Sequence, residues 1–241
     1  MLSKSKNVFT LFVIAILLNT LPTTSAHAQR DRVSRGSGAA TLCSDEEPKV
    51  VVKLATSKTR YYKNHSAQTI NSIHNSGGGG TILGLAGGPI EITTRGQFAI
   101  RTLKGKACVQ IKNIEVLFWA KPVIVIASNF PKGSCEYNAV FAHEQDHVRK
   151  TRRFLREYAP ELRREAREII ETSRQRLVVT ENRIEDAQKK LQEPIISRLA
   201  LFQNKIMPIL QSRQAEIDSP EEYKKVSDKC DNWGKRLIGY N

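Results

Sequence analysis

Apolar and polar residues alternate through much of the segment from residue 49 to 130, as they do in half-buried strands. The alternation and the many β-branched residues predict strands over 50–54, 90–103, 108–120 and 122–127, with a shorter extended piece at 61–62. Lys104-Gly105-Lys106 predicts a tight turn between two of them. We expect a small antiparallel sheet.

Glycines interrupt this β-rich part. Four of them stand in a row at 77–80, and Gly84, Gly87 and Gly88 follow shortly after. A phosphate-binding loop needs a Lys-Ser/Thr pair after the glycines, which is absent here, so we interpret the segment as a loop. Just before it, isoleucines at helical spacing after a serine predict a short helix over 66–74.

The hydrophobic period changes to that of a helix after residue 131. Ser134 is a suitable N-cap for a helix over 135–158, which Pro160 should end or kink. Apolar residues then recur at spacings of three and four, first to residue 192 and again over 195–210, where Pro208 should introduce a kink. The two stripes predict an antiparallel helical hairpin, and a capping box at 219–222 predicts a last helix.

The chain therefore divides into a β-rich part, 49–130, and a helical part, 131–241, preceded by a polar arm, 29–48. The expected class is α+β, with a small antiparallel sheet followed by the helix over 135–158 and the long helical hairpin. Residues 1–28 are typical of a signal peptide, with a basic start, an apolar run over 8–21 and a small-x-small site at 26–28. An uncleaved anchor is the alternative, but the run is short for a membrane span.

Export changes how cysteines and charge are interpreted. Four cysteines in an exported chain favour two disulfides, in any of three pairings: Cys43, Cys108, Cys135 and Cys230. A catalytic Cys135 thiol is a weaker alternative in an oxidising space. The formal net charge is +14, and loss of Lys4 and Lys6 with the signal leaves +12. Outside the cytoplasm, anionic envelope surfaces or acidic polymers are better candidate partners than nucleic acid, although solvated lysines and arginines explain the charge equally well.

Basic residues are concentrated after residue 148. Ten arginines and lysines but only five glutamates lie between Arg149 and Arg176, so pairing cannot neutralise them all. Helical spacing predicts pairs within the helix, such as Arg153 with Glu157 and Arg164 with Glu168. The surplus charge is either a solvated face or a surface for anionic head groups.

The strongest chemical signal is His143-Glu144-Gln145-Asp146-His147. On a helix, His143 and His147 lie on one face, so both imidazoles can bind one Zn²⁺ ion. Glu144 can then take a proton from a metal-bound water, as a general base does. The sequence predicts a zinc site with His143 and His147 as ligands.

A third ligand is harder to place. Later positions at the histidine spacing of longer zinc motifs are Lys150 and Arg153, so another element must supply the ligand. If the chain reverses near Pro160, Glu171 is the first candidate and Glu168 the next. If the helix instead continues through Pro160, both glutamates lie too far from the histidines, and the alternative third ligands are His65 and His74.

The motif resembles the zincin metallopeptidases, in which two histidines bind zinc and the glutamate is the general base. The stretch 134–148 is also similar to a family of exported bacterial proteins of unknown function, regarded as candidate zinc peptidases, whose layout matches residues 49–235. The resemblance implies a zinc-dependent hydrolase of peptide bonds, with a protein or peptide as substrate. The alternatives are a non-catalytic envelope protein that binds an anionic surface or a partner through its basic helices, and a cell-wall amidase.

Overall fold

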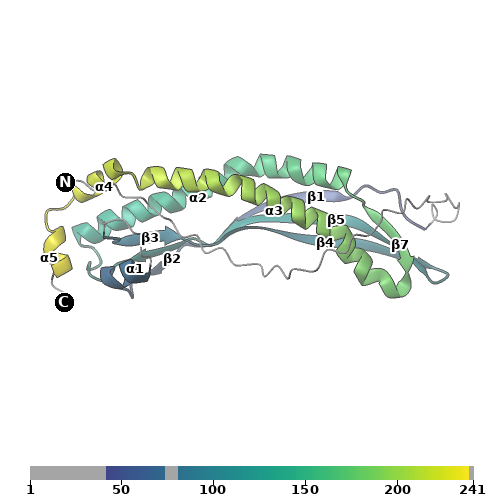
Figure 1. Ribbon diagram of the computed structural model, residues 1–241, viewed down its shortest axis with the longest axis horizontal. Helices are drawn as coiled ribbons and strands as arrows, with labels where there is room; N and C mark the ends of the chain where they lie inside the picture. Colours follow the sequence, from purple (N-terminus) through teal and green to yellow (C-terminus); the bar gives the residue numbers. More distant parts are fainter. Residues whose placement is uncertain (1–41, 74–80, 239–241) are drawn as a thin grey trace, which may run out of the picture.

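The computed structural model describes residues 42–73 and 81–238 and shows an elongated molecule (Figure 1). Two β-sheets follow one another along its length, and two long helices run beside them. The elements are β1 Lys49–Thr56, β2 Arg60–Tyr62, α1 Ala67–Ile73, β3 Gly84–Gly87, β4 Ile90–Leu103, β5 Lys106–Ala120, β6 Val123–Ile126, α2 Cys135–Thr172, β7 Arg176–Thr180, the 3-10 turn η1 Glu181–Arg183, α3 Ile184–Ile217, α4 Pro220–Ser227 and α5 Trp233–Ile238. The expected α+β class is confirmed. The expected signal peptide and the 77–80 loop lie outside the described residues.

Strand β5 organises the larger sheet, called sheet A. It pairs with β4 in the predicted antiparallel hairpin, whose turn places Lys104 and Gly105 at positive φ. Its other edge is shared by β1, which runs parallel to it, and β7, which is antiparallel. The smaller sheet B has the order β2-β6-β3, again with one parallel and one antiparallel pair. Both sheets are therefore mixed, and the expectation of one purely antiparallel sheet is wrong, because β1 and β2 pair in parallel with strands much later in the chain.

Two strands differ from the sequence expectations. Strand β3 lies in the glycine-rich segment that the sequence indicated as a loop, and it pairs with β6 along its whole length. Strand β7 lies where continuous helix was expected. Its residues are β-branched or apolar in the middle, and the edge of β5 provides hydrogen-bond partners that a helix at this place would leave unused.

Helix α2 is one continuous helix of 38 residues, and the expectation of an end near Pro160 is wrong. Ser134 caps its start as predicted, by accepting a hydrogen bond from the amide of Tyr137. Proline removes one helical hydrogen bond, at roughly 3 kcal/mol. Buried side chains on both sides of it, including Leu155 and Leu162, continue in one stripe against sheet A, and their burial offsets that loss.

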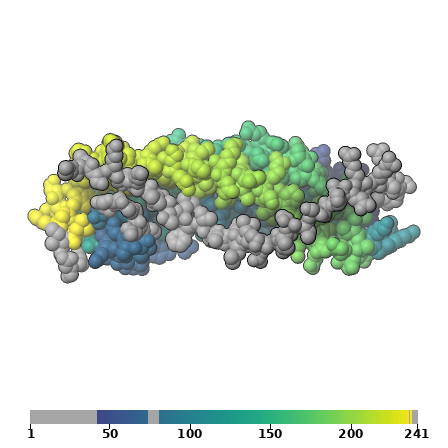
Figure 2. All heavy atoms as spheres, in the orientation of Figure 1, coloured from purple at the N-terminus to yellow at the C-terminus, as the bar shows by residue number. Residues whose placement is uncertain are grey.

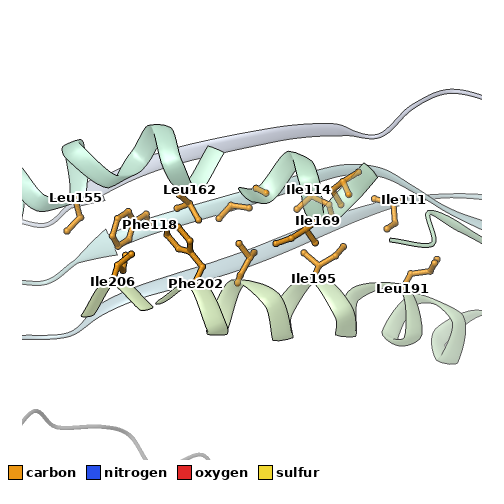
Figure 3. Packing of buried hydrophobic residues seen from close by; sticks show 14 of the residues in the cluster. Ile111, Ile114, Phe118, Leu155, Leu162, Ile169, Leu191, Ile195, Phe202 and Ile206 are labelled. Carbon is orange, nitrogen blue, oxygen red and sulfur yellow. The ribbon is translucent and has the colours of Figure 1, made fainter. Parts of the chain in front are cut away.

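Helix α3 returns antiparallel to α2, so a helical hairpin is confirmed, but the expected break at Pro194 between its two helices is wrong. It spans 34 residues and contains both Pro194 and Pro208. The predicted stripe over 195–210 is buried. Figure 3 shows it meeting the side chains of α2 and sheet A in one hydrophobic core, with Ile195, Phe202 and Ile206 on the α3 side. Turn and strand residues 173–183, including β7, connect the two helices.

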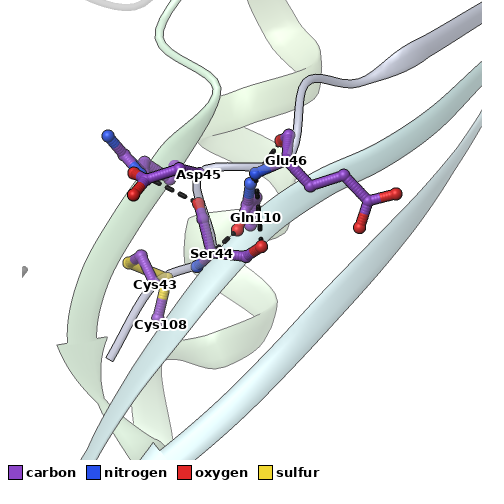
Figure 4. The surroundings of a disulfide bond; sticks show 7 residues. Cys43, Ser44, Asp45, Glu46, Cys108 and Gln110 are labelled. Atoms are coloured by element: carbon purple, nitrogen blue, oxygen red, sulfur yellow. Dashed lines mark hydrogen bonds and ion pairs between the residues drawn. A yellow bond between two sulfur atoms is a disulfide. The ribbon is translucent and has the colours of Figure 1, made fainter. Parts of the chain in front are cut away.

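Two disulfides are present, Cys43–Cys108 and Cys135–Cys230, and no cysteine is free. The alternative of a catalytic Cys135 thiol is therefore excluded. Cys43 ties the segment before β1 to β5, where the side chain of Gln110 bonds the backbone on both sides of Asp45 (Figure 4). Such bridges fit an oxidising, extracytoplasmic compartment. In the part of the chain that the structure describes, no helix combines the length and apolar character needed to cross a membrane.

Candidate metal centre

The first four turns of α2 pack against sheet B. Val140 and Val148 are buried in a second hydrophobic cluster that includes Ile124 and Ile126 of β6. This packing fixes the rotation of the helix, so that Glu144 turns toward β3 and the two motif histidines turn toward the end of α3. The imidazole rings of His143 and His147 lie with their centroids 5.0 Å apart.

Asp218 completes the cluster. It is the residue that ends α3 and precedes Ser219, the N-cap of α4. Its Oδ1 lies 3.3 Å from Nε2 of His143 and 3.1 Å from Nε2 of His147, and the two Nε2 atoms are 3.4 Å apart. All three side chains are buried, and together they form a group that can hold a metal ion.

Gln214, one turn before Asp218, determines the tautomer of His147. Its amide nitrogen faces the backbone carbonyl of His147 at 3.1 Å and the hydroxyl of Thr151 at 2.9 Å. A carbonyl only accepts hydrogen bonds, so this contact fixes which end of the amide is the nitrogen. Oε1 of Gln214 then faces Nδ1 of His147 at 2.6 Å, and Nδ1 must carry a proton to donate. Nε2 of a neutral His147 is left with a lone pair that points into the cluster.

That lone pair faces other acceptors. Asp218 Oδ1 lies in front of it and also accepts a hydrogen bond from the hydroxyl of Tyr223 at 2.9 Å. The arrangement is favourable when a cation lies among the three atoms, which means either a second proton on His147 or a metal ion. Burial lowers the pKa of His147, but its bonds to Asp218 outweigh burial and raise it. A metal ion bound by the same atoms takes the place of that proton.

The electrostatics of Asp218 agree with a cationic centre. Burial opposes its ionisation, yet the hydrogen bonds from the two imidazoles hold the pKa of Asp218 far below its usual value. Burial raises the pKa of Tyr223, and the charge of Asp218 raises it further, so the phenol stays protonated and donates. The ring of Tyr223 also lies 5.4 Å from that of His143.

Glu144 occupies a tight space beside β3. It is 4 % exposed, and a Cβ placed on Gly84 would lie 2.7 Å from its Oε1 and 2.5 Å from a methyl carbon of Val140. Only glycine therefore lets this strand approach the helix so closely. Burial raises the pKa of Glu144 to about 7, against the opposing effects of both histidines and of a hydrogen bond from the Ala86 amide.

The structure brings together only part of the predicted ligand set. His143 and His147 converge as expected. Glu171 is 24 residues beyond His147 on the same continuous helix, about 36 Å along its axis, and Glu168 is only one turn closer. Neither can share a metal with the histidines. His65 is not part of the cluster, and His74 lies outside the described residues.

Sequence reasoning missed Asp218 and Gln214, and it assigned no role to Tyr223. The signal for Asp218 was present, because it directly precedes the capping box that was recognised at 219–222. It was missed because a return of the chain to the histidines was considered only through a reversal near Pro160. A reversal at 173–183 returns the end of α3, not its beginning, to the histidines.

Comparison of this chain with models of known protein families, with curated proteins and with solved structures gave no match in any of the three searches.

Proposed function

We propose that this protein is an exported zinc-dependent hydrolase that acts on peptide bonds. His143, His147 and Asp218 are the zinc ligands in this proposal, and Glu144 is the general base. The carrying observation is the distance between the three ligand atoms, 3.1 to 3.4 Å. Tetrahedral zinc with bonds of about 2.0 to 2.1 Å separates its ligand atoms by about 3.3 to 3.4 Å, so the buried triad matches zinc without rearrangement.

Two imidazoles and one carboxylate leave a fourth position for water, which is the pattern of catalytic rather than structural zinc sites. Bound zinc supplies Lewis acidity and lowers the pKa of that water. The role of this chain's own residues is to place and move the proton. Glu144 accepts it, and a pKa near 7 suits a group that takes a proton and later gives it up.

Tyr223 and Gln214 support the ligands from behind. The hydroxyl of Tyr223 donates to the same Oδ1 of Asp218 that faces the histidines, and this bond orients the carboxylate. Gln214 holds His147 with the lone pair of Nε2 turned toward the metal position. Hydrogen bonds of this kind around a metal site typically change metal affinity by 10- to 100-fold.

The choice of a peptide as substrate rests on β3. This strand is at the edge of sheet B, and its Gly84 and Ala86 touch Glu144. An extended peptide can pair with such an edge through main-chain hydrogen bonds, which would bring a peptide carbonyl near the general base.

Metal analysis and a matched pair of variants test the proposal. The purified mature protein should contain about one zinc per chain, and His143→Ala should lose it. Glu144→Gln should keep the zinc and lose hydrolysis of an unfolded protein substrate. A peptide library and cell-wall fragments, assayed in parallel, separate a peptidase from an amidase. Absence of zinc from the native protein, together with unchanged stability of His143→Ala, would overturn the proposal.

A further inference from the structure

The solvent-facing side of α2 carries a row of arginines beyond the metal centre. Arg156, Arg163, Arg164 and Arg167 are all exposed and recur at helical spacing. Arg156, Arg163 and Arg167 are seven and four residues apart and share one face of the helix, and Arg164 adjoins it, so the four guanidinium groups line about 16 Å of α2. This set is called the arginine face below.

The glutamates of α2 do not neutralise it. Four of them lie further around the helix and bond to basic residues of α3, and exposed Glu171 follows Arg167 by four residues without an ion pair among the described residues. The pairs are Glu157–Arg213, Glu161–Lys205, Glu165–Arg198 and Glu168–Arg198. Of the pairs predicted within α2, Arg153 with Glu157 is present, at 2.7 Å, whereas Glu168 pairs with α3 and not with Arg164.

The arginine face therefore keeps most of its positive charge. Among residues 42–73 and 81–238, none of its four arginines forms an ion pair with a carboxylate. Four like charges on one helix face repel each other, and packing or internal pairing does not explain them. The arrangement of glutamates toward α3 and arginines toward solvent concentrates positive charge on one side of the molecule.

An exposed apolar residue lies on the neighbouring helix. Leu201 lies three residues after Arg198 and four before Lys205, both of which pair with glutamates of α2. Residues at this spacing lie on one side of a helix, so Leu201 lies on the same side of α3 as these two residues. It is 66 % exposed, more than any other large hydrophobic side chain in the described part of the chain. The two helices lie side by side along the molecule, which presents a long outer face (Figure 2).

We propose that this outer face binds the surface of an anionic phospholipid bilayer. Guanidinium groups pair with phosphate oxygens two at a time, and arginines in a row meet many head groups at once. A long helical layer fits a flat surface, and the exposed side chain of Leu201 can enter the head-group region. A soluble polyanion has no apolar region for this side chain to enter. The proposal is independent of zinc binding and of hydrolysis.

Vesicle sedimentation of the mature protein tests it. Vesicles of phosphatidylcholine with about 30 % phosphatidylglycerol should bind the protein, and pure phosphatidylcholine vesicles should not. Each arginine near an anionic surface contributes about fivefold in binding, so Arg156→Ala/Arg163→Ala/Arg167→Ala should weaken binding on the order of 100-fold.

A second triple variant controls for net charge. Arg95→Ala/Arg101→Ala/Lys112→Ala removes the same charge from exposed positions of sheet A and should bind nearly as well as the wild type. Leu201→Ser should weaken binding several-fold with all charges in place. Equal losses in the two triple variants would mean that only net charge matters, and binding of soluble polyphosphate without binding of vesicles would mean a polymer site. Either result overturns the proposal.

Discussion

Gln214 offers the most direct test of how this site is built. The change to make is Gln214→Leu, which shortens the side chain by one bond, keeps its apolar bulk and removes all of its hydrogen bonds. Three contacts are lost: to Nδ1 of His147 at 2.6 Å, to its backbone carbonyl at 3.1 Å and to Thr151 at 2.9 Å. His147 is then free to place its proton on Nε2, the nitrogen that faces Asp218 and the metal position.

The expected magnitude follows from that loss of orientation. Removing the partner of a metal-binding histidine weakens metal affinity by about 10- to 100-fold, which corresponds to about 1.4 to 2.8 kcal/mol. Zinc affinity is measured by competition with a chromophoric chelator at constant pH. Gln214→Glu should keep most of the affinity, because its carboxylate still accepts the bond from Nδ1.

A matched control lies one turn earlier on the same helix. Gln211 is exposed, and Gln211→Leu should leave zinc affinity unchanged. The reasoning is refuted if Gln214→Leu binds zinc as tightly as the wild type. A lower melting temperature without any change in zinc affinity would show that Gln214 only packs and does not orient His147.

Three further predictions follow from the structure. Gly84→Ala should destabilise the fold by about 1 to 3 kcal/mol in chemical denaturation, whereas Gly87→Ala, where a Cβ meets nothing within 4 Å, should not. Replacing either the Cys135–Cys230 or the Cys43–Cys108 disulfide by serines should lower the free energy of unfolding by about 4 to 5 kcal/mol. Only the loss of Cys135–Cys230 should also weaken zinc binding, and a chelator titration of both variants measures the zinc affinity. With zinc at about 1,000 times its Kd, addition of a chelator should lower the melting temperature measured by calorimetry by roughly 10 °C. The same addition should leave the melting temperature of His147→Ala unchanged.

Strands and helices with a strong internal pattern could be predicted from the sequence. Strand β4 has the bounds that the alternation indicated, and the capping box at Ser219 begins α4 as expected. Local signals decide such elements. Pro160 shows the limit, because its effect on α2 depends on how much apolar surface the flanking turns bury against sheet A, and that quantity belongs to the folded molecule.

The same contrast between local signals and long-range packing applies to the candidate metal centre. The histidine spacing on one helix is a local property, so two of the three residues of the cluster could be predicted from the sequence. Asp218 joins it from 71 residues beyond His147, and its place depends on where the hairpin turns. Strand β7 determines that turn, and its β-branched residues form a strand because the edge of β5 provides hydrogen-bond partners. No pattern within residues 173–183 alone carries this information.

The length of the α2–α3 hairpin has a consequence for how this protein can change over time. Neither the turn at 173–183 nor most of the two helices touches the metal position, yet together they set which residue of α3 arrives beside His147. Inserting one residue into α3 would rotate Asp218 by about 100° and move it about 1.5 Å. Substitutions along the hairpin are therefore tolerable wherever packing allows, whereas insertions and deletions within its helices are not, and the number of residues between His147 and Asp218 is itself a requirement of the site.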